Sequence, residues 1–160
     1  LREDLEGAAG SRVLELYSGA GLFTLPLAAL AGDRGQVLSL EGNEQAVRDA
    51  RRTLHDHPTA RLASGRVSAR SVRELAGSFT GGRPDVVVLD PPRQGAGCEV
   101  IEAVGALGAE RIVLVACDPA ALARDLGTLL RSGYTLGSMS ALDMFPHTHH
   151  FETIAVLERS

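Results

Sequence analysis

The sequence predicts an α/β fold: a mostly parallel sheet with helices on both faces and an antiparallel last strand. Short β-rich apolar runs alternate with longer amphipathic stretches, as strands and crossover helices do in such sheets. The runs VVVL at 86–89 and IVLV at 112–115 are apolar without alternation, which is typical of strands buried on both faces. The chain closes with two strand-like segments and no helix between them, which indicates an antiparallel pair.

The elements follow one another along the whole chain. The expected strands are Arg12–Tyr17, Gln36–Leu40, a weaker one near Ala60–Val67, Asp85–Leu89, Arg111–Ala116, Tyr134–Leu142 and His150–Glu158. The expected helices are Leu22–Ala31, Glu44–His55, Ser71–Ala76, Glu99–Leu107 and Pro119–Arg131. The last helix carries the clearest boundaries, because Asp118 can cap it, Pro119 suits its first position and Gly133 follows its end.

Length and composition indicate one globular domain. The 160 residues are 44% hydrophobic and 22% charged, and no apolar run is long enough to span a membrane. Two cysteines without CxxC spacing argue against a disulfide framework and favour a reduced, cytoplasmic setting. The first residue is Leu1, and the opening LREDLEGAAG is typical of the tail of an earlier element. We therefore expect residues 1–160 to be one domain of a longer protein.

A glycine-containing turn follows the first strand and predicts a nucleotide site. Gly19 and Gly21 permit a tight turn and close approach of a ligand at the carboxyl edge of the sheet. Glu41, twenty residues beyond Gly21, can accept the two ribose hydroxyls of an adenosine. Thr24 stands where a dinucleotide fold needs its third glycine, so these residues favour S-adenosylmethionine over NAD modestly. A purely structural turn is the alternative.

The segment Asp90-Pro91-Pro92-Arg93 follows the fourth strand directly. Two prolines after a buried strand form a rigid, extended exit that holds Asp90 at the sheet edge. Arg93 is a cation suited to a carbonyl oxygen or a developing enolate, which argues against methylation of an exocyclic amine. The alternative is a surface loop with an ordinary acidic residue.

The segment Ala116-Cys117-Asp118-Pro119 follows the fifth strand at the same edge. Cys117 then lies before a helix N-terminus, where the helix dipole and free N–H groups favour the thiolate. A buried, inert thiol is the ordinary alternative for a single cysteine, but the carboxyl edge is where α/β sheets carry out chemistry. Cys98, at the start of another helix, has no such neighbours and is interpreted as structural.

The segment from Asp143 to Glu152 carries three histidines and one further carboxylate. His147, His149 and His150 suggest a metal site, but the nearby cysteines and carboxylates lack a recognised ligand spacing, so no metal is expected. Glu152 enters the last strand, either in a structural ion pair or in a functional role.

Taken together, these segments resemble the RNA uracil-5 methyltransferases, which act on transfer RNA and large-subunit ribosomal RNA. The resemblance covers nearly the whole chain, through VLELYSGAGLFTLPLA, LEGNEQAVRDAR, DVVVLDPPRQG, VLVACDPAALARDL and DMFPHTHHFE. It implies a Rossmann-like seven-stranded methyltransferase sheet and S-adenosylmethionine as cofactor. It also implies that residues 1–160 are the C-terminal catalytic domain, without the N-terminal RNA-binding region. The net charge of −4 agrees with an RNA grip located mainly in that region.

The resemblance also assigns roles to residues. It implies that Cys117 is the nucleophile that adds to carbon 6 of the uracil, that Glu152 removes the proton from carbon 5, and that Arg93 lies close to the target base. The implied cofactor contacts are Tyr17, Ser18, Gly19, Gly21, Leu22, Glu41 and Asp90. The expected function is therefore methylation of carbon 5 of a uridine in structured RNA, ribosomal or transfer, after extrusion of the base.

Several positions depart from the family pattern. Glu15 and Ser18 replace an aspartate and a cysteine, which we expect to be tolerated. Asp118 places a like charge beside the nucleophile, and Arg66 replaces the acid that meets the adenine amine. Two other functions therefore stay open. One is methylation of carbon 5 of another pyrimidine such as cytosine, and the other is a catalytically degenerate module that only binds cofactor or docks RNA.

Overall fold

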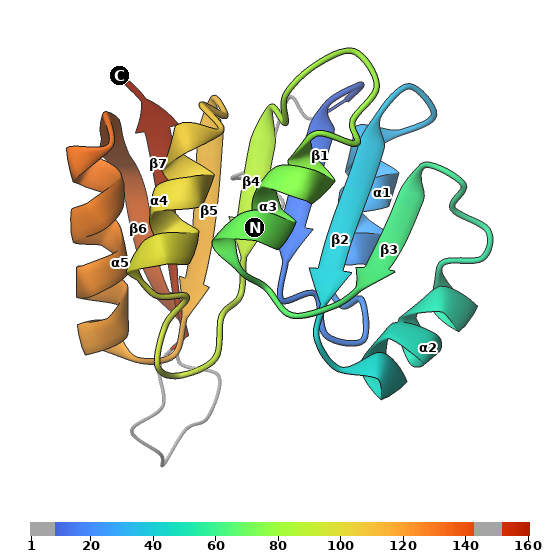
Figure 1. The fold of residues 1–160 in the computed structure, drawn as a ribbon, viewed down its shortest axis with the longest axis horizontal. Coiled ribbons are helices and arrows are strands. Elements are labelled where there is room, and N and C mark those ends of the chain that lie inside the picture. Colours follow the sequence, from blue (N-terminus) through green and yellow to red (C-terminus); the bar gives the residue numbers. More distant parts are fainter. Residues whose placement is uncertain (1–8, 143–151) are drawn as a thin grey trace.

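The computed structural model describes residues 9–142 and 152–160, and these form a seven-stranded sheet flanked by helices (Figure 1). The strands are β1 Arg12–Leu16, β2 Gln36–Glu41, β3 Ala60–Ser64, β4 Val86–Leu89, β5 Arg111–Ala116, β6 Tyr134–Leu142 and β7 Glu152–Arg159. The helices are α1 Thr24–Ala31, α2 Glu44–Thr53, α3 Ala69–Ala76, α4 Cys98–Ala106 and α5 Pro119–Arg131. The predicted sequence of elements is confirmed.

The strand order is β3-β2-β1-β4-β5-β7-β6, and only β7 runs against its neighbours β5 and β6. The predicted antiparallel last strand is therefore confirmed. The chain moves outward from β1 to β3 and then returns to the other side of β1 as β4, so the order reverses between β1 and β4. Open α/β sheets bind their ligands at such a reversal, outside the carboxyl ends of the strands. That edge is the lower one in Figure 1.

The central strands β1, β2, β4 and β5 are buried on both faces, as their apolar runs predict, whereas the edge strand β6 is exposed along most of its length. Alternate strand residues divide between two cores: Leu14 belongs to the larger one with Ile101 of α4, and Val13 to the smaller one with Leu27 of α1. Helices α3, α4 and α5 cover the face toward the viewer in Figure 1, and α1 lies behind the sheet. No helix in the described part of the chain has the length and apolarity to cross a membrane.

The elements differ from the prediction mainly at their ends. β1 ends at Leu16 because Tyr17 adopts a left-handed conformation with φ of 64°. α3 begins at Ala69, earlier than predicted, because Ser68 caps it through the backbone N–H of Ser71 at 3.2 Å. The boundaries of α5 are confirmed: the Asp118 carboxylate accepts the N–H of Ala121 at 2.8 Å.

Candidate functional site

Three chemically distinct side chains leave the sheet in one row at its carboxyl edge. Leu16 of β1 pairs with Leu40 of β2 on one side and with Leu89 of β4 on the other. The next residue of each strand is therefore level with the others, and these residues are Tyr17, Glu41 and Asp90. The strand register thus brings together three of the residues that the sequence predicts for cofactor binding.

The glycine turn is fastened to Glu41. One carboxylate oxygen of Glu41 accepts the N–H of Gly19 at 2.8 Å, and the other accepts the N–H of Asn43 at 2.7 Å. Gly21, with φ of 86°, closes the turn by donating to the Ser18 carbonyl at 2.9 Å. A carboxylate offers about four acceptor positions, so Glu41 keeps capacity for the two hydroxyls of a ribose.

Glu15 is a buried acid directly beneath this row, with 1% of its surface exposed. One of its oxygens, Oε2, accepts the hydroxyls of Thr24 and Ser39, each at 2.5 Å. Among the described residues, Glu15 Oε1 and the buried Ser18 hydroxyl have no hydrogen-bond partner. Burial raises the pKa of Glu15 to about 7 against the two hydroxyls, and the charges of Asp90 and Glu41 add to the rise.

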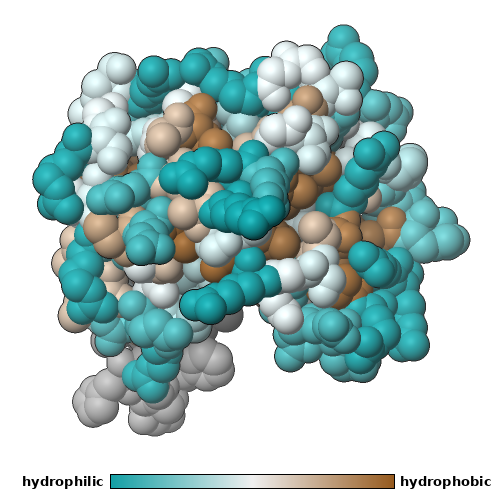
Figure 2. Space-filling view, viewed as in Figure 1, coloured by the Kyte–Doolittle hydropathy of each residue, from teal (hydrophilic) through white to brown (hydrophobic). Residues whose placement is uncertain are grey.

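The segment after β4 forms the wall opposite Glu41. Gly95 donates its N–H to the Pro92 carbonyl at 2.8 Å, which closes a tight turn with Arg93 exposed at its tip. A cavity of about 530 Å³ lies between residues of this segment, 92–97, and the ends of the first three strands. Its lining is Tyr17, Glu41, Gly42, Arg66 and Val67 on one side and Pro92, Gln94, Gly95, Ala96 and Gly97 on the other. Figure 2 shows the lower edge of the molecule hollowed between its two halves.

Cys117 and Glu152 come together at the same edge from strands that run in opposite directions. Ala116 of β5 pairs with Thr153 of β7, so the residue after β5 and the first residue of β7 lie across from each other. The Cys117 thiol is free and half-buried. Asp90 is exposed at the rim beside them. Its pKa is raised to about 6, first by the protein atoms that crowd the carboxyl group and then by the charge of Glu152.

The other predicted residues have clear positions. Ser18 is buried inside the glycine turn, and Leu22 is 79% exposed beside it. Cys98 is the first residue of α4, as predicted, and its exposed thiol donates to Glu102 at 3.1 Å. The three histidines lie outside the described residues, so the prediction about metal stays a prediction.

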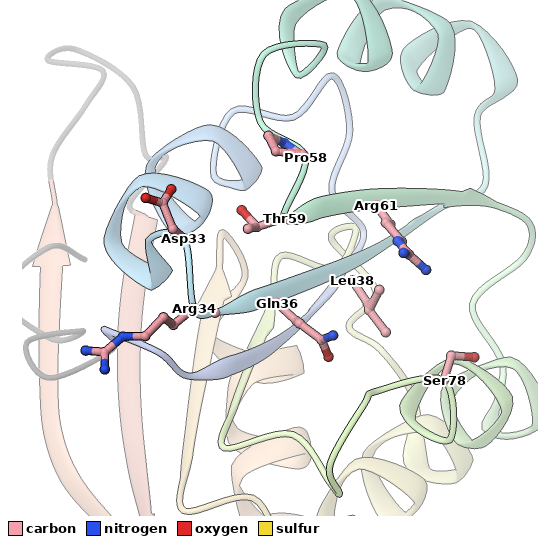
Figure 3. Close-up of a pocket in the computed structure, with 9 residues that line it drawn as sticks. Asp33, Arg34, Gln36, Leu38, Pro58, Thr59, Arg61 and Ser78 are labelled. Atoms are coloured by element: carbon pink, nitrogen blue, oxygen red, sulfur yellow. The ribbon is translucent and has the colours of Figure 1, made fainter.

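A second cavity, of about 280 Å³, lies away from this edge, at the amino ends of β2 and β3 (Figure 3). In Figure 3 Gln36 and Leu38 of β2 point to the same side as Arg61 of β3, while Arg34 points away from them. Gln36 is already engaged, since its side-chain carbonyl accepts the Thr80 N–H at 3.0 Å. None of the residues predicted for catalysis or cofactor binding lines this cavity.

Sequence reasoning missed three features of the carboxyl edge. The left-handed Tyr17 has no sequence signal, because a tyrosine rarely adopts that conformation. The burial of Glu15 and the hydroxyls that hold it follow from packing between three elements. Asp125 of α5 is 5% exposed and accepts the Ala96 N–H at 2.9 Å. Its position on the apolar face of a predicted helix was the available signal.

Comparisons with known proteins agree with this geometry. Residues 3–160 match the family described as tRNA (Uracil-5-)-methyltransferase. The chain is 45% identical over 157 residues to an uncharacterized RNA methyltransferase of Bifidobacterium longum, covering 97% of this chain and 35% of that protein. It is 39% identical over 158 residues to the 23S rRNA (uracil(1939)-C(5))-methyltransferase RlmD of Acinetobacter baumannii, covering 98% and 34%. The chain thus spans about a third of the length of these curated relatives.

A solved structure shares the fold closely. The tRNA (uracil-54, C5)-methyltransferase of Pyrococcus abyssi, in complex with S-adenosyl-L-homocysteine, superposes with a TM-score of 0.77 at 32% identity. The match covers 98% of this chain and 36% of that one. The predicted methyltransferase sheet is therefore confirmed.

Proposed function

The chain belongs to the tRNA (uracil-5-)-methyltransferase family, and from this premise we propose that it is the catalytic domain of an enzyme that methylates carbon 5 of a uridine in structured RNA. The observation that carries the proposal is the meeting of Cys117 and Glu152 across the Ala116–Thr153 register at the carboxyl edge. A nucleophile and a carboxylate base on opposite strands can act on the two adjacent carbons of one pyrimidine ring.

S-adenosylmethionine fits the same edge. The cavity of about 530 Å³ lies within the usual range for small-molecule sites, and Glu41 keeps acceptor capacity for a ribose. Buried polar atoms are rarely left without a partner, so the unpartnered Glu15 Oε1 and Ser18 hydroxyl beside the glycine turn support a functional role for this edge. We assign the cofactor to Tyr17, Ser18, Gly19, Gly21, Leu22, Glu41 and Asp90. When bound, it supplies an electrophilic methyl group on a sulfonium.

The residues of the chain then divide the reaction. The Cys117 thiolate adds to carbon 6 of the extruded uracil, and the ring electrons move to the carbon-4 oxygen as an enolate. Arg93, at the tip of the turn, stabilises that negative charge. The enolate electrons return through carbon 5, which would take the methyl group as the methyl–sulfur bond of the cofactor breaks and S-adenosylhomocysteine is left. Glu152 removes the carbon-5 proton, the double bond between carbons 5 and 6 re-forms, and the Cys117 thiolate leaves.

The test uses the full-length protein with S-adenosylmethionine and 23S rRNA or tRNA transcripts that contain 5-fluorouridine. Because fluorine cannot be removed as a proton, the reaction stops at the covalent adduct, which survives a denaturing gel. Cys117→Ala should abolish the adduct. Cys98→Ala is the matched control, because the Cys98 thiol is exposed on α4 and its hydrogen-bonding neighbours, Glu102 of α4 and Thr128 of α5, have no part in the proposed reaction. It should leave the adduct unchanged.

Two further arms separate the alternatives. Glu152→Gln should accumulate an adduct on ordinary uridine transcripts, because the carbon-5 proton stays in place. Transcripts with 5-fluorocytidine should give none. An undiminished adduct in Cys117→Ala would overturn the mechanism. An adduct only with 5-fluorocytidine would identify a cytosine enzyme, and the absence of both adduct and methyl transfer would identify a degenerate module.

A further inference from the structure

The carboxylate of Asp125 is buried, yet nothing in the reaction uses it. It lies in the middle of α5, 5% exposed, among residues that otherwise pack the core. An isolated buried carboxylate is costly, and such groups persist where hydrogen bonds or charges compensate them. In the described part of the chain, this carboxylate accepts the backbone N–H of Ala96 at 2.9 Å.

Three consecutive residues of the 92–97 segment rest on α5 at this point. The Gln94 carbonyl accepts the Arg124 guanidinium at 3.3 Å, and the Ala96 N–H donates to Asp125. Between them Gly95 lies so close that an added Cβ would be 2.9 Å from the Asp125 carboxylate and 3.3 Å from Ala121. Gly95 also has φ of 84°, so both space and conformation require glycine there.

This contact determines where two functional features lie. Gly95 closes the turn that carries Arg93 at its tip. Holding Gly95 and Ala96 against α5 therefore also holds the backbone position of Arg93. The same segment forms one wall of the 530 Å³ cavity. Across the cavity, the charge of Asp125 contributes, after burial, to a raised pKa of Tyr17, which places the carboxylate within electrostatic reach of the opposite wall.

α5 also begins at the nucleophile. Its N-cap is Asp118, the residue after Cys117. The helix that starts beside the thiol therefore holds, two turns later, the segment that carries Arg93, the cation proposed to stabilise the enolate. We propose that Asp125 is a positioning residue. It clamps the 92–97 segment onto α5, and so fixes the positions of the cofactor cavity and of Arg93 relative to Cys117. The proposal rests on the proposed function for its ligand, while the clamp itself is independent of any ligand.

The first experiment measures the clamp without ligand, by hydrogen exchange of the Ala96 amide in the full-length protein. Asp125→Ala removes the acceptor and should speed this exchange about 10-fold or more, as expected for a hydrogen bond to a charged group. Asp125→Asn keeps an acceptor oxygen in the same place and should restore most of the protection. Unchanged Ala96 exchange in Asp125→Ala would overturn the proposal.

The second experiment measures S-adenosylhomocysteine binding by calorimetry. Asp125→Ala should weaken the affinity about 10-fold, and Asp125→Asn should stay within about 3-fold of the natural protein. The matched control is Thr128→Val, because Thr128 is also buried on α5 but its hydroxyl bonds Arg124 and Arg131 of the same helix and the Cys98 thiol of α4, none of them in the 92–97 segment. This control should lower stability and leave affinity unchanged.

The outcomes separate the two proposals. If the natural protein does not bind S-adenosylhomocysteine, the proposed function fails, and the exchange experiment still decides the clamp. If it binds and Asp125→Ala binds equally well, the positioning role fails. If Thr128→Val weakens binding as much as Asp125→Ala, the effect belongs to helix stability and the positioning role also fails.

Discussion

The amino and carboxyl edges of this sheet place charged side chains in opposite surroundings. At the amino edge Arg12 and Asp85 form a two-pronged ion pair, with side-chain distances of 2.7 and 3.1 Å, and the Arg12 N–H adds a third bond at 2.8 Å. At the carboxyl edge the charge of Asp90 acts on Glu15 and the charge of Glu152 acts on Asp90, so that acids lie near acids. Glu15 also keeps one oxygen unpartnered among the described residues. The pKa of Asp85 is lowered by its partner, whereas those of Glu15 and Asp90 are raised.

The paired charges of the amino edge stabilise the fold, whereas the unpaired acids of the carboxyl edge belong to the candidate site. A charge with an opposite partner and satisfied hydrogen bonds lowers the free energy of the folded chain. Acids brought together without cations raise it, and such arrangements concentrate at functional sites. The same residue types therefore carry opposite signs of stability at the two ends of one sheet, and substitutions can measure those signs.

The largest expected effect is at Glu15. The folded protein keeps a proton on Glu15 up to a pH of about 7, whereas the unfolded chain releases it near 4.5. Unfolding therefore releases a proton in that window. The stabilising contribution is complete below the unfolded pKa and is lost as the pH rises toward 7. Glu15→Gln does not titrate, so the natural protein should lose up to about 3 kcal/mol relative to it between pH 4.5 and 8.

The measurement is hydrogen exchange of the β1 amides in both proteins at pH 5 and pH 8, compared as protection factors. Asp33→Asn, in the loop before β2, is the control for a simple change in net charge. A constant difference between Glu15→Gln and the natural protein across this range would show that Glu15 stays ionised in the fold. The two edges would then differ less than the structure indicates.

The opposite sign is expected at the amino edge. Asp85→Asn should destabilise the protein by about 1–2 kcal/mol at neutral pH, because Arg12 loses its charged partner. The lowered pKa of Asp85 means that this contribution is present above the ordinary aspartate value and is lost as the pH falls through the lowered one. The difference should therefore shrink below about pH 4, and S-adenosylhomocysteine affinity should not change. If Asp85→Asn stabilised the protein, the charged groups of the two edges would not contribute to stability with opposite signs.

Sequence reasoning captured the carboxyl edge where local signals are strong. Buried apolar runs, turn glycines and the capped start of α5 each have a physical reason visible within a few residues, and their order predicts the strand ends that carry Tyr17, Glu41, Asp90 and Cys117. Arg12 and Asp85 are 73 residues apart, and Asp125 and Ala96 are 29 apart. Such pairs are determined by the register of strands and the packing of α5, which no local pattern contains.

The smallest expected effect, and the sharpest test of the carboxyl edge, concerns Asp90 and Glu152. If the Asp90 carboxylate contacts the cofactor, as proposed, S-adenosylhomocysteine affinity should fall a few-fold as the pH drops through about 6, the raised pKa of Asp90. Part of that rise comes from the charge of Glu152, so Glu152→Gln should move the midpoint to lower pH. Calorimetric titrations from pH 5 to 8, in a Glu15→Gln background that removes the titration near 7, measure it.

Asp90→Asn supplies the control for that experiment, since it should abolish the pH dependence near 6 and leave a weaker, constant affinity. A midpoint that stays in place in Glu152→Gln would mean that the two carboxylates do not interact across the edge. Cys117 and Glu152 would then lie farther from the cofactor side of the cavity than the strand register implies. A midpoint that moves would show instead that the charges at the ends of β1, β2 and β4, where the cofactor is proposed to bind, interact with the proposed catalytic pair at the ends of β5 and β7. The carboxyl edge would then act as a single electrostatic site of interacting acids, unlike the amino edge, where Arg12 and Asp85 form an ion pair of opposite charges.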